Sequence, residues 1–271
     1  MEEVIRPGAV DDDRLDRSRR VEWLDIDAVI EARVLMAGAG ALGNEVAKNL
    51  ALSGFRDIRI VDMDRIVGSN LNRCMFFNSD DASTRRLKAE VLADRVNTLC
   101  GDARATGIVR RVEEIPAEEF DAADIVIGCL DNIAARAYVN AATYAAGKLY
   151  VDGGMDGLIG KVMIVRPPNG ACLACGMNRS HSRVADVRFS CTGSEVTFHE
   201  PRLAAEVTTT SVIGAVIVRE AVKHVSGRSD LLLSNLFYYD GSRNRSEELE
   251  IEMNPDCAVH RERQATGIRN P

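Results

Sequence analysis

Four side chains of the types that bind zinc stand in two pairs with the same spacing. Cys172 and Cys175 form a Cys-x-x-Cys pair in a stretch rich in Pro and Gly, and Cys257 and His260 form a Cys-x-x-His pair near the end of the chain. Two such pairs are typical of a closed, tetrahedral structural zinc site. Zn²⁺ bound there would join the end of the chain to its middle. A redox-active thiol pair, or thiols without a common role, is the alternative interpretation.

Cys191 stands apart from both pairs, in the polar stretch 178–201, and is followed by Thr and Gly. A thiol in an exposed polar loop ionises more readily than a buried one, and the thiolate is the nucleophilic form. We therefore expect Cys191 to be a nucleophile, with an inert surface thiol as the alternative. Cys74, Cys100 and Cys129 lie in or beside apolar stretches or the predicted nucleotide crevice, and we expect them to be packing residues.

A glycine-rich turn between two apolar runs predicts a nucleotide-binding unit. Gly38, Gly40 and Gly43 follow the run that begins at Val34, and a helical period leads from them to a second run that ends at Asp62. The first glycine allows a tight turn, the second lets the backbone approach a phosphate, and the third lets the helix pack close to the sheet. The N-terminus of that helix attracts an anion, and Asp62 is placed to accept hydrogen bonds from ribose hydroxyls.

Two acids and two cations favour a triphosphate over a dinucleotide as the ligand of this turn. Asp62 and Asp131 end separate apolar runs, which we expect to be neighbouring strands. A dinucleotide needs one such acid for its ribose, whereas a second acid beside phosphates is favourable only if a cation such as Mg²⁺ neutralises it. Arg73 and Lys88 would then stabilise the charge that develops as pyrophosphate leaves. For each residue alone, a structural ion pair is the alternative.

The periodicity of the apolar residues predicts the elements that position these side chains. Strands are predicted at 34–37, 58–61, 105–112, 124–128, 149–152 and 161–166, followed by two late strands at 231–241 and 249–253. Helical periods lie between them, after a charged helical stretch at 14–31. This alternation predicts an α/β fold: a Rossmann-like, doubly wound and mostly parallel sheet with a late extension of mixed strands.

The composition excludes several classes of function. The 271 residues carry a net charge of −7, so nucleic acid is not the expected partner. No segment approaches the ~20 apolar residues that a membrane span needs, and the first residues contain no apolar core of a secretion signal. We therefore expect a cytoplasmic protein whose cysteines are reduced.

A known family shares these motifs in combination. The chain resembles the adenylation domain of ubiquitin-activating enzymes in the segments GAGALGNEVAKNLALSG, IVDMDRIVGSNLNR, LKAEV and LDNIAAR and in its Cys-x-x-Cys pair. That family, the ThiF/MoeB/HesA superfamily of adenylyltransferases, includes bacterial activators of sulfur-carrier proteins. The resemblance implies a ThiF-like adenylation domain at 14–260, with a nucleotide-binding half at about 30–166 and a zinc and catalytic-cysteine half at about 167–260. A disordered N-terminus at 1–13 and a tail at 261–271 would flank it.

The resemblance also implies roles for single residues. The glycine loop would hold the ATP phosphates, Asp62 the ribose and Asp131 the Mg²⁺ ion. The set of nucleotide-site residues is completed by Asp64, Asn70, Arg73, Lys88, Asn132 and Arg136. An N-terminal arginine would cross a dimer interface into the partner's site; Arg17 matches best, with Arg20 as the second choice.

The second half resembles the catalytic subunits of ubiquitin-like protein activators, in particular that for NEDD8, more than it resembles the sulfur-carrier enzymes. The similarity lies in IGKVMIVRPPNGACLACG and FSCTGS. In those enzymes the cysteine that matches Cys191 takes the acyl group as a thioester. The chain departs from the family pattern at Cys74, where Gln is usual, and at His260, where Cys is usual.

The predicted function is ATP-dependent activation of a small ubiquitin-like protein that ends in glycine. Adenylation would use Arg73, Lys88, Asp131 and Arg17, and a thioester would then form on Cys191. The expected cofactors are ATP, Mg²⁺ and Zn²⁺, the expected assembly is a homodimer, and a conjugating enzyme stays open as a further partner. The alternatives are an adenylyltransferase for a sulfur-carrier protein in molybdopterin or thiamine synthesis, an NAD(P)-dependent dehydrogenase, and a non-catalytic scaffold subunit.

Overall fold

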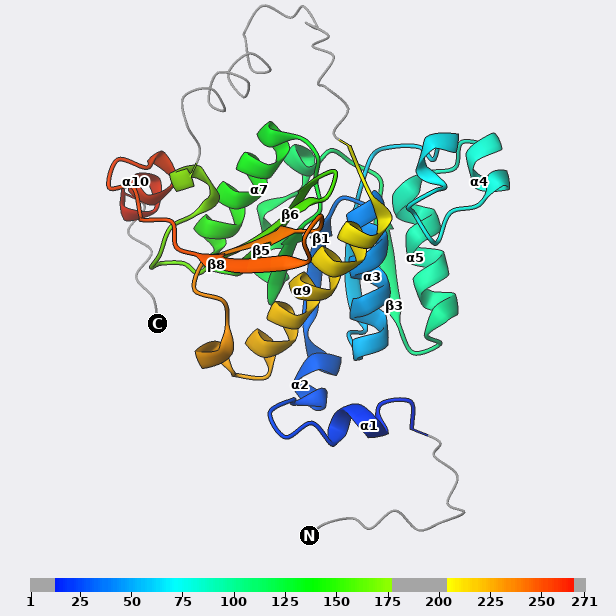
Figure 1. Cartoon of the computed structure of the whole chain (residues 1–271), viewed down its shortest axis with the longest axis horizontal. Coiled ribbons are helices and arrows are strands. Elements are labelled where there is room, and N and C mark those ends of the chain that lie inside the picture. The colour runs from blue at the N-terminus through cyan, green and yellow to red at the C-terminus, as the bar shows by residue number, and fades with distance from the viewer. Residues whose placement is uncertain (1–12, 177–203, 266–271) are drawn as a thin grey trace, which may run out of the picture.

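One mixed sheet organises the computed structural model, which describes residues 13–176 and 204–265. Across the described sheet the strands are β3 (Arg104–Ile108), β2 (Asp57–Val61), β1 (Arg33–Ala37), β4 (Ile125–Gly128), β5 (Leu149–Asp156), β6 (Ile159–Val165), β7 (Leu236–Asp240) and β8 (Arg245–Leu249). The strands from β3 to β5 are parallel, and β6, β7 and β8 extend the sheet with antiparallel pairs (Figure 1). The predicted doubly wound, mostly parallel sheet with a late extension is therefore confirmed.

Helices cover both faces of this sheet. One face carries α2 (Ile26–Glu31), α3 (Ala41–Ser53), α5 (Lys88–Leu99) and α9 (Val207–Val225), and the other carries α6 (Ala117–Ala122), α7 (Ile133–Ala146) and α10 (Ala258–Ala265). The alternation of β1 shows the reason: Val34 and Met36 lie in the first of these cores, and Leu35 and Ala37 lie in the second. A strand that is buried on both faces is a continuous apolar run, as is usual in parallel sheets.

Three expectations about element boundaries are wrong in detail. β3 ends at Ile108 rather than at 112, because Val112 turns away into a short 3₁₀ helix and packs against the second core. The last strand is β8, and 250–253 lies outside it. Beyond β8, Ile251 donates its N–H to Asn235 Oδ1 instead of to a strand. The stretch 14–31 forms two short helices, α1 (Asp16–Arg19) and α2.

The sheet order also corrects the expected adjacency of two acids. Asp62 follows β2 and Asp131 follows β4, but β1 lies between these strands. The two acids therefore flank the carboxyl end of β1 instead of ending neighbouring strands. In a doubly wound sheet, this edge is where ligands bind, so the geometry still brings both acids to the predicted crevice.

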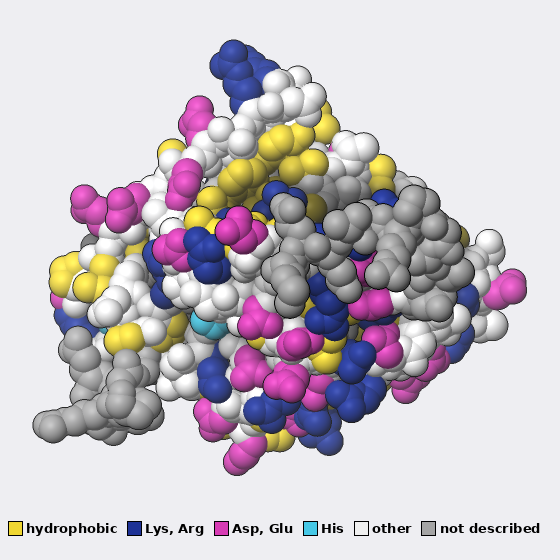
Figure 2. Space-filling view, turned by 90° about the horizontal axis from the view of Figure 1, so that it is seen from below, with side chains coloured by type: hydrophobic (Ala, Val, Ile, Leu, Met, Phe, Trp, Pro, Cys, Tyr) yellow, Lys and Arg dark blue, Asp and Glu magenta, His cyan; other side chains and the backbone are white. Residues whose placement is uncertain are grey.

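Acidic and basic side chains intermix on the face seen from below, and neither sign dominates it (Figure 2). No helix in the described ranges has both the length and the apolar character that a bilayer crossing requires. α10 continues to Ala265, into the range predicted as a tail, and the other predicted domain boundaries stay predictions.

Candidate functional site

The glycine turn after β1 leaves open space at its centre. Gly38 has φ +103°, and a Cβ there would lie 2.5 Å from Cys129 O. A Cβ on Gly43 would lie 2.1 Å from Gly38 O, so the turn and the first turn of α3 pack too closely for any side chain. A Cβ on Gly40, by contrast, would meet no atom within 4 Å, and this glycine is the N-cap of α3. The turn thus presents free backbone N–H groups that could bind an anion.

Asp62 lies directly behind this turn and fixes its shape. Its two carboxylate oxygens accept hydrogen bonds from the N–H of Ala39, at 2.7 Å, and from the N–H of Asp64, at 2.8 Å. Burial raises the pKa of Asp62, although Lys88 and the two N–H donors act against that rise. The carboxylate therefore holds the loops after β1 and β2 together, at the position predicted to contact ribose.

Lys88 opens α5 and lies among three carboxylates. Its Nζ donates to Asp64 Oδ2 at 2.8 Å, and its side chain is 12 % exposed. Burial acts to lower the pKa of Lys88, but the charges of Asp62, Asp64 and Asp131 outweigh burial and raise it. Lys88 therefore stays protonated, and its anionic partner is Asp64. A lysine at a helix N-terminus opposes the helix dipole, which Asp64 offsets here.

The loop after β2 is held by its own polar side chains. Asn70 Oδ1 accepts the N–H of Val67 at 3.0 Å. Arg73 donates to the carbonyl of Ser69 and, at 2.9 Å, to Asn72 Oδ1. Beneath them burial raises the pKa of Cys74 to about 11, so this thiol is a packing residue, as predicted. The loop thus presents the half-buried Arg73 at the same crevice as Lys88.

α7 begins at the crevice, and two predicted site residues have structural partners there. Asn132 caps the helix, because its Oδ1 accepts the N–H groups of Ala134 and Ala135 at 3.0 and 3.2 Å. Arg136 pairs with the buried Asp152, which also accepts the hydroxyl of Tyr150 at 2.7 Å. The charge of Asp152 raises the pKa of Arg136 further.

Asp152 and Tyr150 were missed by the sequence reasoning. A signal for Asp152 was present, because an acid that ends the apolar run Leu149–Asp152 needs a buried partner. Asp131, by contrast, is exposed at the carboxyl end of β4 and so is accessible to a ligand.

The four predicted zinc ligands meet in one cluster. Their ligand atoms all lie within 4.8 Å of one another. Cys172 Sγ lies 3.9 Å from Cys175 Sγ and 3.7 Å from Cys257 Sγ, and Cys175 Sγ lies 3.7 Å from His260 Nε2. These distances are far too long for a disulfide of about 2.05 Å. They match the separation of about 3.8 Å that tetrahedral Zn–S bonds of about 2.3 Å impose on two sulfurs.

The surroundings of this cluster also suit zinc. Three of the four side chains, Cys172, Cys257 and His260, are buried, and burial lowers the pKa of His260, which favours the neutral imidazole that binds metal. The ring of His260 stacks on Tyr144 of α7 with centroids 4.7 Å apart and an angle of 15° between the planes. The residue set therefore fits a closed zinc site that joins the 3₁₀ helix η3 (Leu173–Gly176) to α10.

Arg17 lies far from the glycine turn of its own chain. Leu15 is buried, and its side chain packs against Gly54 at the C-terminal end of α3. Arg14 anchors the same segment by donating to Asp102 and to Ala51 O. Since α3 has 13 residues, its two ends are roughly 20 Å apart. α1, which carries Arg17, is therefore at the opposite end of α3 from the predicted phosphate site (Figure 1).

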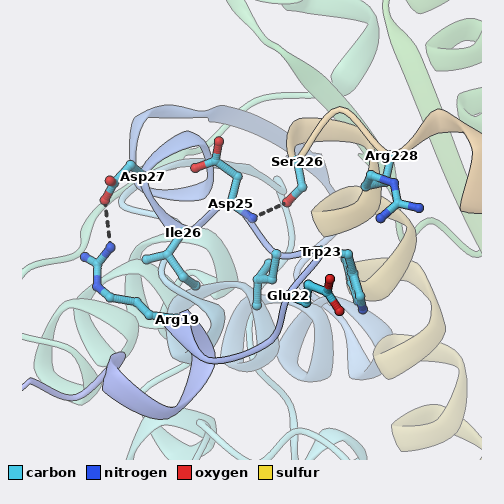
Figure 3. A pocket seen from close by; sticks show the side chains of 9 residues that line it. Arg19, Glu22, Trp23, Asp25, Ile26, Asp27, Ser226 and Arg228 are labelled. Carbon is cyan, nitrogen blue, oxygen red and sulfur yellow. Dashed lines mark hydrogen bonds and ion pairs between the residues drawn. The ribbon is translucent and has the colours of Figure 1, made fainter. Parts of the chain in front are cut away.

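A hollow of about 510 Å³ lies at this same end of the molecule, away from the glycine turn. Figure 3 shows it between the loop before α2 and the residues that follow α9. Trp23 and Glu22 line it beside Arg228, and Arg19 is paired with Asp27 at 2.9 Å. Because it is lined by residues 19–27, 226 and 228 rather than by the glycine turn, this hollow is not the predicted nucleotide site. Cys191, the predicted nucleophile, falls outside the described residues.

Comparison with known proteins gives a family and a set of relatives. The model of the ThiF family matches residues 18–259. The chain is 35% identical over 151 residues to the SUMO-activating enzyme subunit uba-2 of Caenorhabditis elegans and 34% identical over 181 residues to the NEDD8-activating enzyme E1 catalytic subunit of the same organism. These matches cover 55% and 60% of this chain but 26% and 42% of the relatives, so the chain spans less than half the length of either.

Solved structures of E. coli MccB share the fold. The structure with SeMet MccA has a TM-score of 0.73 at 19% identity, covering 93% of this chain and 75% of that one. The structure with ATP has a TM-score of 0.68 at 22% identity, covering 86% of this chain and 68% of that one. At such identities the likeness concerns the fold.

Proposed function

We propose that this chain, which belongs to the ThiF family, uses ATP to activate the C-terminal carboxylate of a small ubiquitin-like protein. The observation that carries the proposal is the meeting of Lys88 with Asp62, Asp64 and Asp131 beside an open glycine turn. Two relatives similar in sequence are named as activating-enzyme subunits for SUMO and NEDD8, which supports the class of partner. The expected partner ends in a flexible glycine tail that can enter the crevice.

The proposed nucleotide site uses the open turn for phosphates and the acids for ribose and metal. Gly40 leaves room for a phosphate at the N-terminus of α3. Asp62 keeps unused lone pairs on oxygens that already accept two N–H groups, so it can accept ribose hydroxyls as well. The exposed Asp131 would hold Mg²⁺, which supplies neutralisation of the phosphate charge.

The proposed reaction is an in-line displacement at the α-phosphorus of ATP. A carboxylate oxygen of the partner's C-terminus forms a bond to that phosphorus, and the bond from phosphorus to the bridging oxygen of pyrophosphate breaks. The products are an acyl-adenylate and pyrophosphate. Lys88 and Arg73 carry the positive charge that stabilises the leaving group, with Asn70 shaping the loop that presents Arg73. Asn132 and Arg136 contribute by fixing α7, which follows Asp131.

A thioester on Cys191 is the proposed second step. The Cys191 thiolate attacks the carbonyl carbon of the acyl-adenylate, AMP leaves, and the partner stays bound through sulfur. Cys191 lies outside the described residues, so its sequence context and the resemblance to ubiquitin-like protein activators support this step. Transfer to a conjugating enzyme would follow.

A second copy of the chain is proposed to complete the site. Within one chain Arg17 lies about the length of α3 away from the glycine turn, so it could reach a nucleotide only in a partner. Arg20, the second choice, pairs with Asp16 on the same short segment. A homodimer would place the Arg17 guanidinium beside the phosphates of the other protomer.

Zn²⁺ is proposed to be held by Cys172, Cys175, Cys257 and His260. It would cross-link η3 and α10, and it would hold His260 in place against Tyr144 of α7. No step of the reaction passes through this metal.

The test combines ATP–pyrophosphate exchange with non-reducing gels. Wild type and Cys191→Ala are incubated with Mg²⁺, ATP and a ubiquitin-like protein that ends in glycine, and Cys100→Ala serves as the control thiol. Exchange by all three, with a thiol-sensitive adduct absent only from Cys191→Ala, supports both steps. Exchange without any adduct overturns the thioester step and leaves the sulfur-carrier adenylyltransferase. Absence of nucleotide binding, or tight binding of NADH instead of ATP, overturns the proposal.

A further inference from the structure

Asn140 of α7 carries a buried donor that nothing in the described chain accepts. The residue is 1 % exposed. Its Oδ1 accepts the N–H of Leu173 at 3.0 Å, but its Nδ2 has no hydrogen-bond partner among the described residues. A buried amide group without a partner destabilises the fold, so in a native structure such a group usually serves a ligand, a water or an ion.

The accepted bond places this amide group beside a proposed zinc ligand. Leu173 directly follows Cys172, so the contact at Oδ1 places the amide of Asn140 next to the zinc cluster. Since Cys172 must be a thiolate when it binds zinc, a donor at this position favours the form that binds.

The same face of α7 reaches the other ligand pair. Tyr144 lies four residues after Asn140, hence one turn further along the same helix face. Its ring stacks on His260, and its hydroxyl donates to Pro168 O at 2.7 Å. One helix therefore contacts both halves of the cluster, the residue after Cys172 through Asn140 and His260 through Tyr144.

We propose that Asn140 is a positioning residue of the zinc centre, whose Nδ2 donates an N–H···S hydrogen bond to the Cys172 thiolate when zinc is bound. This inference rests on the zinc assignment of the proposed function, and it goes beyond the four ligands. Hydrogen bonds from outside the ligand shell orient ligands and tune a metal, and their loss typically weakens metal binding about 10–100-fold. Zinc binding, which requires the Cys172 thiolate, would thus provide the acceptor that Asn140 Nδ2 lacks.

The test compares Asn140→Asp with Asn97→Asp. Asp at 140 keeps an acceptor for Leu173 N–H but replaces the donor by a carboxylate. Asn97 is the control on α5, away from the cluster: its Oδ1 likewise accepts a backbone N–H, at 2.7 Å, but its Nδ2 already donates to a backbone carbonyl, at 2.9 Å. Zinc affinity is measured by chelator competition at one pH, and the thiolate-to-metal absorption band is recorded after Co²⁺ loading.

The expected result is a zinc affinity about 10–100-fold weaker in Asn140→Asp, with a shifted Co²⁺ band, and no change in Asn97→Asp. Wild-type affinity and band in Asn140→Asp would overturn the role of Asn140 while leaving the zinc assignment intact. Failure of the wild type itself to bind zinc would overturn both.

A measurement on the wild type covers the case in which the variant does not fold. After loading with ¹¹³Cd²⁺, the side-chain amide protons of Asn140 are expected to show scalar coupling to the metal through the sulfur. No coupling at Asn140, with the metal bound to the three cysteines, would overturn the proposed hydrogen bond.

Discussion

The two candidate sites of this chain differ in how their polar groups are paired without a ligand. In the nucleotide site, Asp62 accepts two backbone N–H groups and Lys88 pairs with Asp64. In the zinc cluster, Cys172 and Cys257 face each other as free thiols, and the donor of Asn140 beside them has no partner among the described residues. When empty, the first site has partners for Asp62 and Lys88, whereas the second leaves a buried amide donor without one in the described residues.

This difference suits the ligand proposed for each site: a substrate that enters and leaves the nucleotide site, and a structural metal that stays in the zinc cluster. A substrate that must enter and depart is best received by a site that neither collapses nor loses much stability when it is empty. A structural metal, in contrast, is retained because without it the buried ligands make only weak contacts with one another. The comparison predicts that metal removal changes stability more than nucleotide removal, and that nucleotide-site variants change activity more than stability.

Loss of one zinc ligand is the largest expected effect. A ligand that binds only the folded state stabilises it by about 4 kcal/mol at a free concentration 1,000 times its Kd. Because zinc binds the folded state, we expect zinc to raise the Tm of the wild type, and we expect no such rise in Cys257→Ser. Cys100→Ser is the matched control, since Cys100 and Cys257 are both 4 % exposed, and it should keep the zinc effect. Thermal melts with zinc and with chelator measure both, and a zinc effect retained by Cys257→Ser would contradict the assignment.

Substitution of Lys88 should affect the reaction more than the fold. Removal of one charge-stabilising donor typically lowers kcat about 10²–10³-fold, which corresponds to about 2.7–4 kcal/mol. We therefore expect Lys88→Met to reduce ATP–pyrophosphate exchange by this factor. Lys223→Met is a close control, because Lys223 is also ion-paired, to Glu220, and its side chain is 16 % exposed against 12 % for Lys88. Equal losses of exchange in the two variants would show that Lys88 acts only through stability.

Two glycines of one turn should separate folding from binding. In Gly43→Ala the new Cβ would lie 2.1 Å from Gly38 O, so the turn must shift and stability should fall by about 1–3 kcal/mol. In Gly40→Ala the Cβ meets no atom within 4 Å, so stability should change by less than about 1 kcal/mol while ATP binding weakens. Urea unfolding and ATP titration measure the two effects. A Gly40→Ala variant that binds ATP as tightly as the wild type would contradict the placement of a phosphate beside Gly40.

What the sequence predicts depends on how local each contact is. The glycine turn was predictable because Gly38 and Gly43 act within one βαβ unit, and the zinc ligands were predictable because each pair keeps a fixed spacing. The pairing of Arg136 with Asp152 and that of Asn140 with Leu173 were not predictable as pairs. They form only after β5 and α7 have packed, and no spacing in the sequence records which residues meet. The adjacency assumed for Asp62 and Asp131 failed for the same reason, since the order of strands is a property of the whole sheet.

The smallest expected effect concerns a partly exposed group of ion pairs that lies outside both candidate sites. Asp102 pairs with Arg14 and Arg56, which anchors the segment that carries α1. Partial burial acts to raise the pKa of Asp102, but hydrogen bonds and charge from Arg14 and Arg56 outweigh it and lower the pKa. A carboxyl whose folded pKa is lowered stabilises the fold above its unfolded pKa of about 3.9, and loses that contribution as the pH falls through the folded value.

Asp102→Asn should therefore lower stability at pH 7 by less than about 1 kcal/mol, because solvent screens the pair, and the difference from wild type should vanish toward pH 2. Asp121→Asn, at an exposed acid of α6 without an ion pair in the described residues, should show no such pH dependence. Urea unfolding at several pH values measures both. A cost for Asp102→Asn that persists at pH 2 would mean that Asp102 acts by packing rather than by charge.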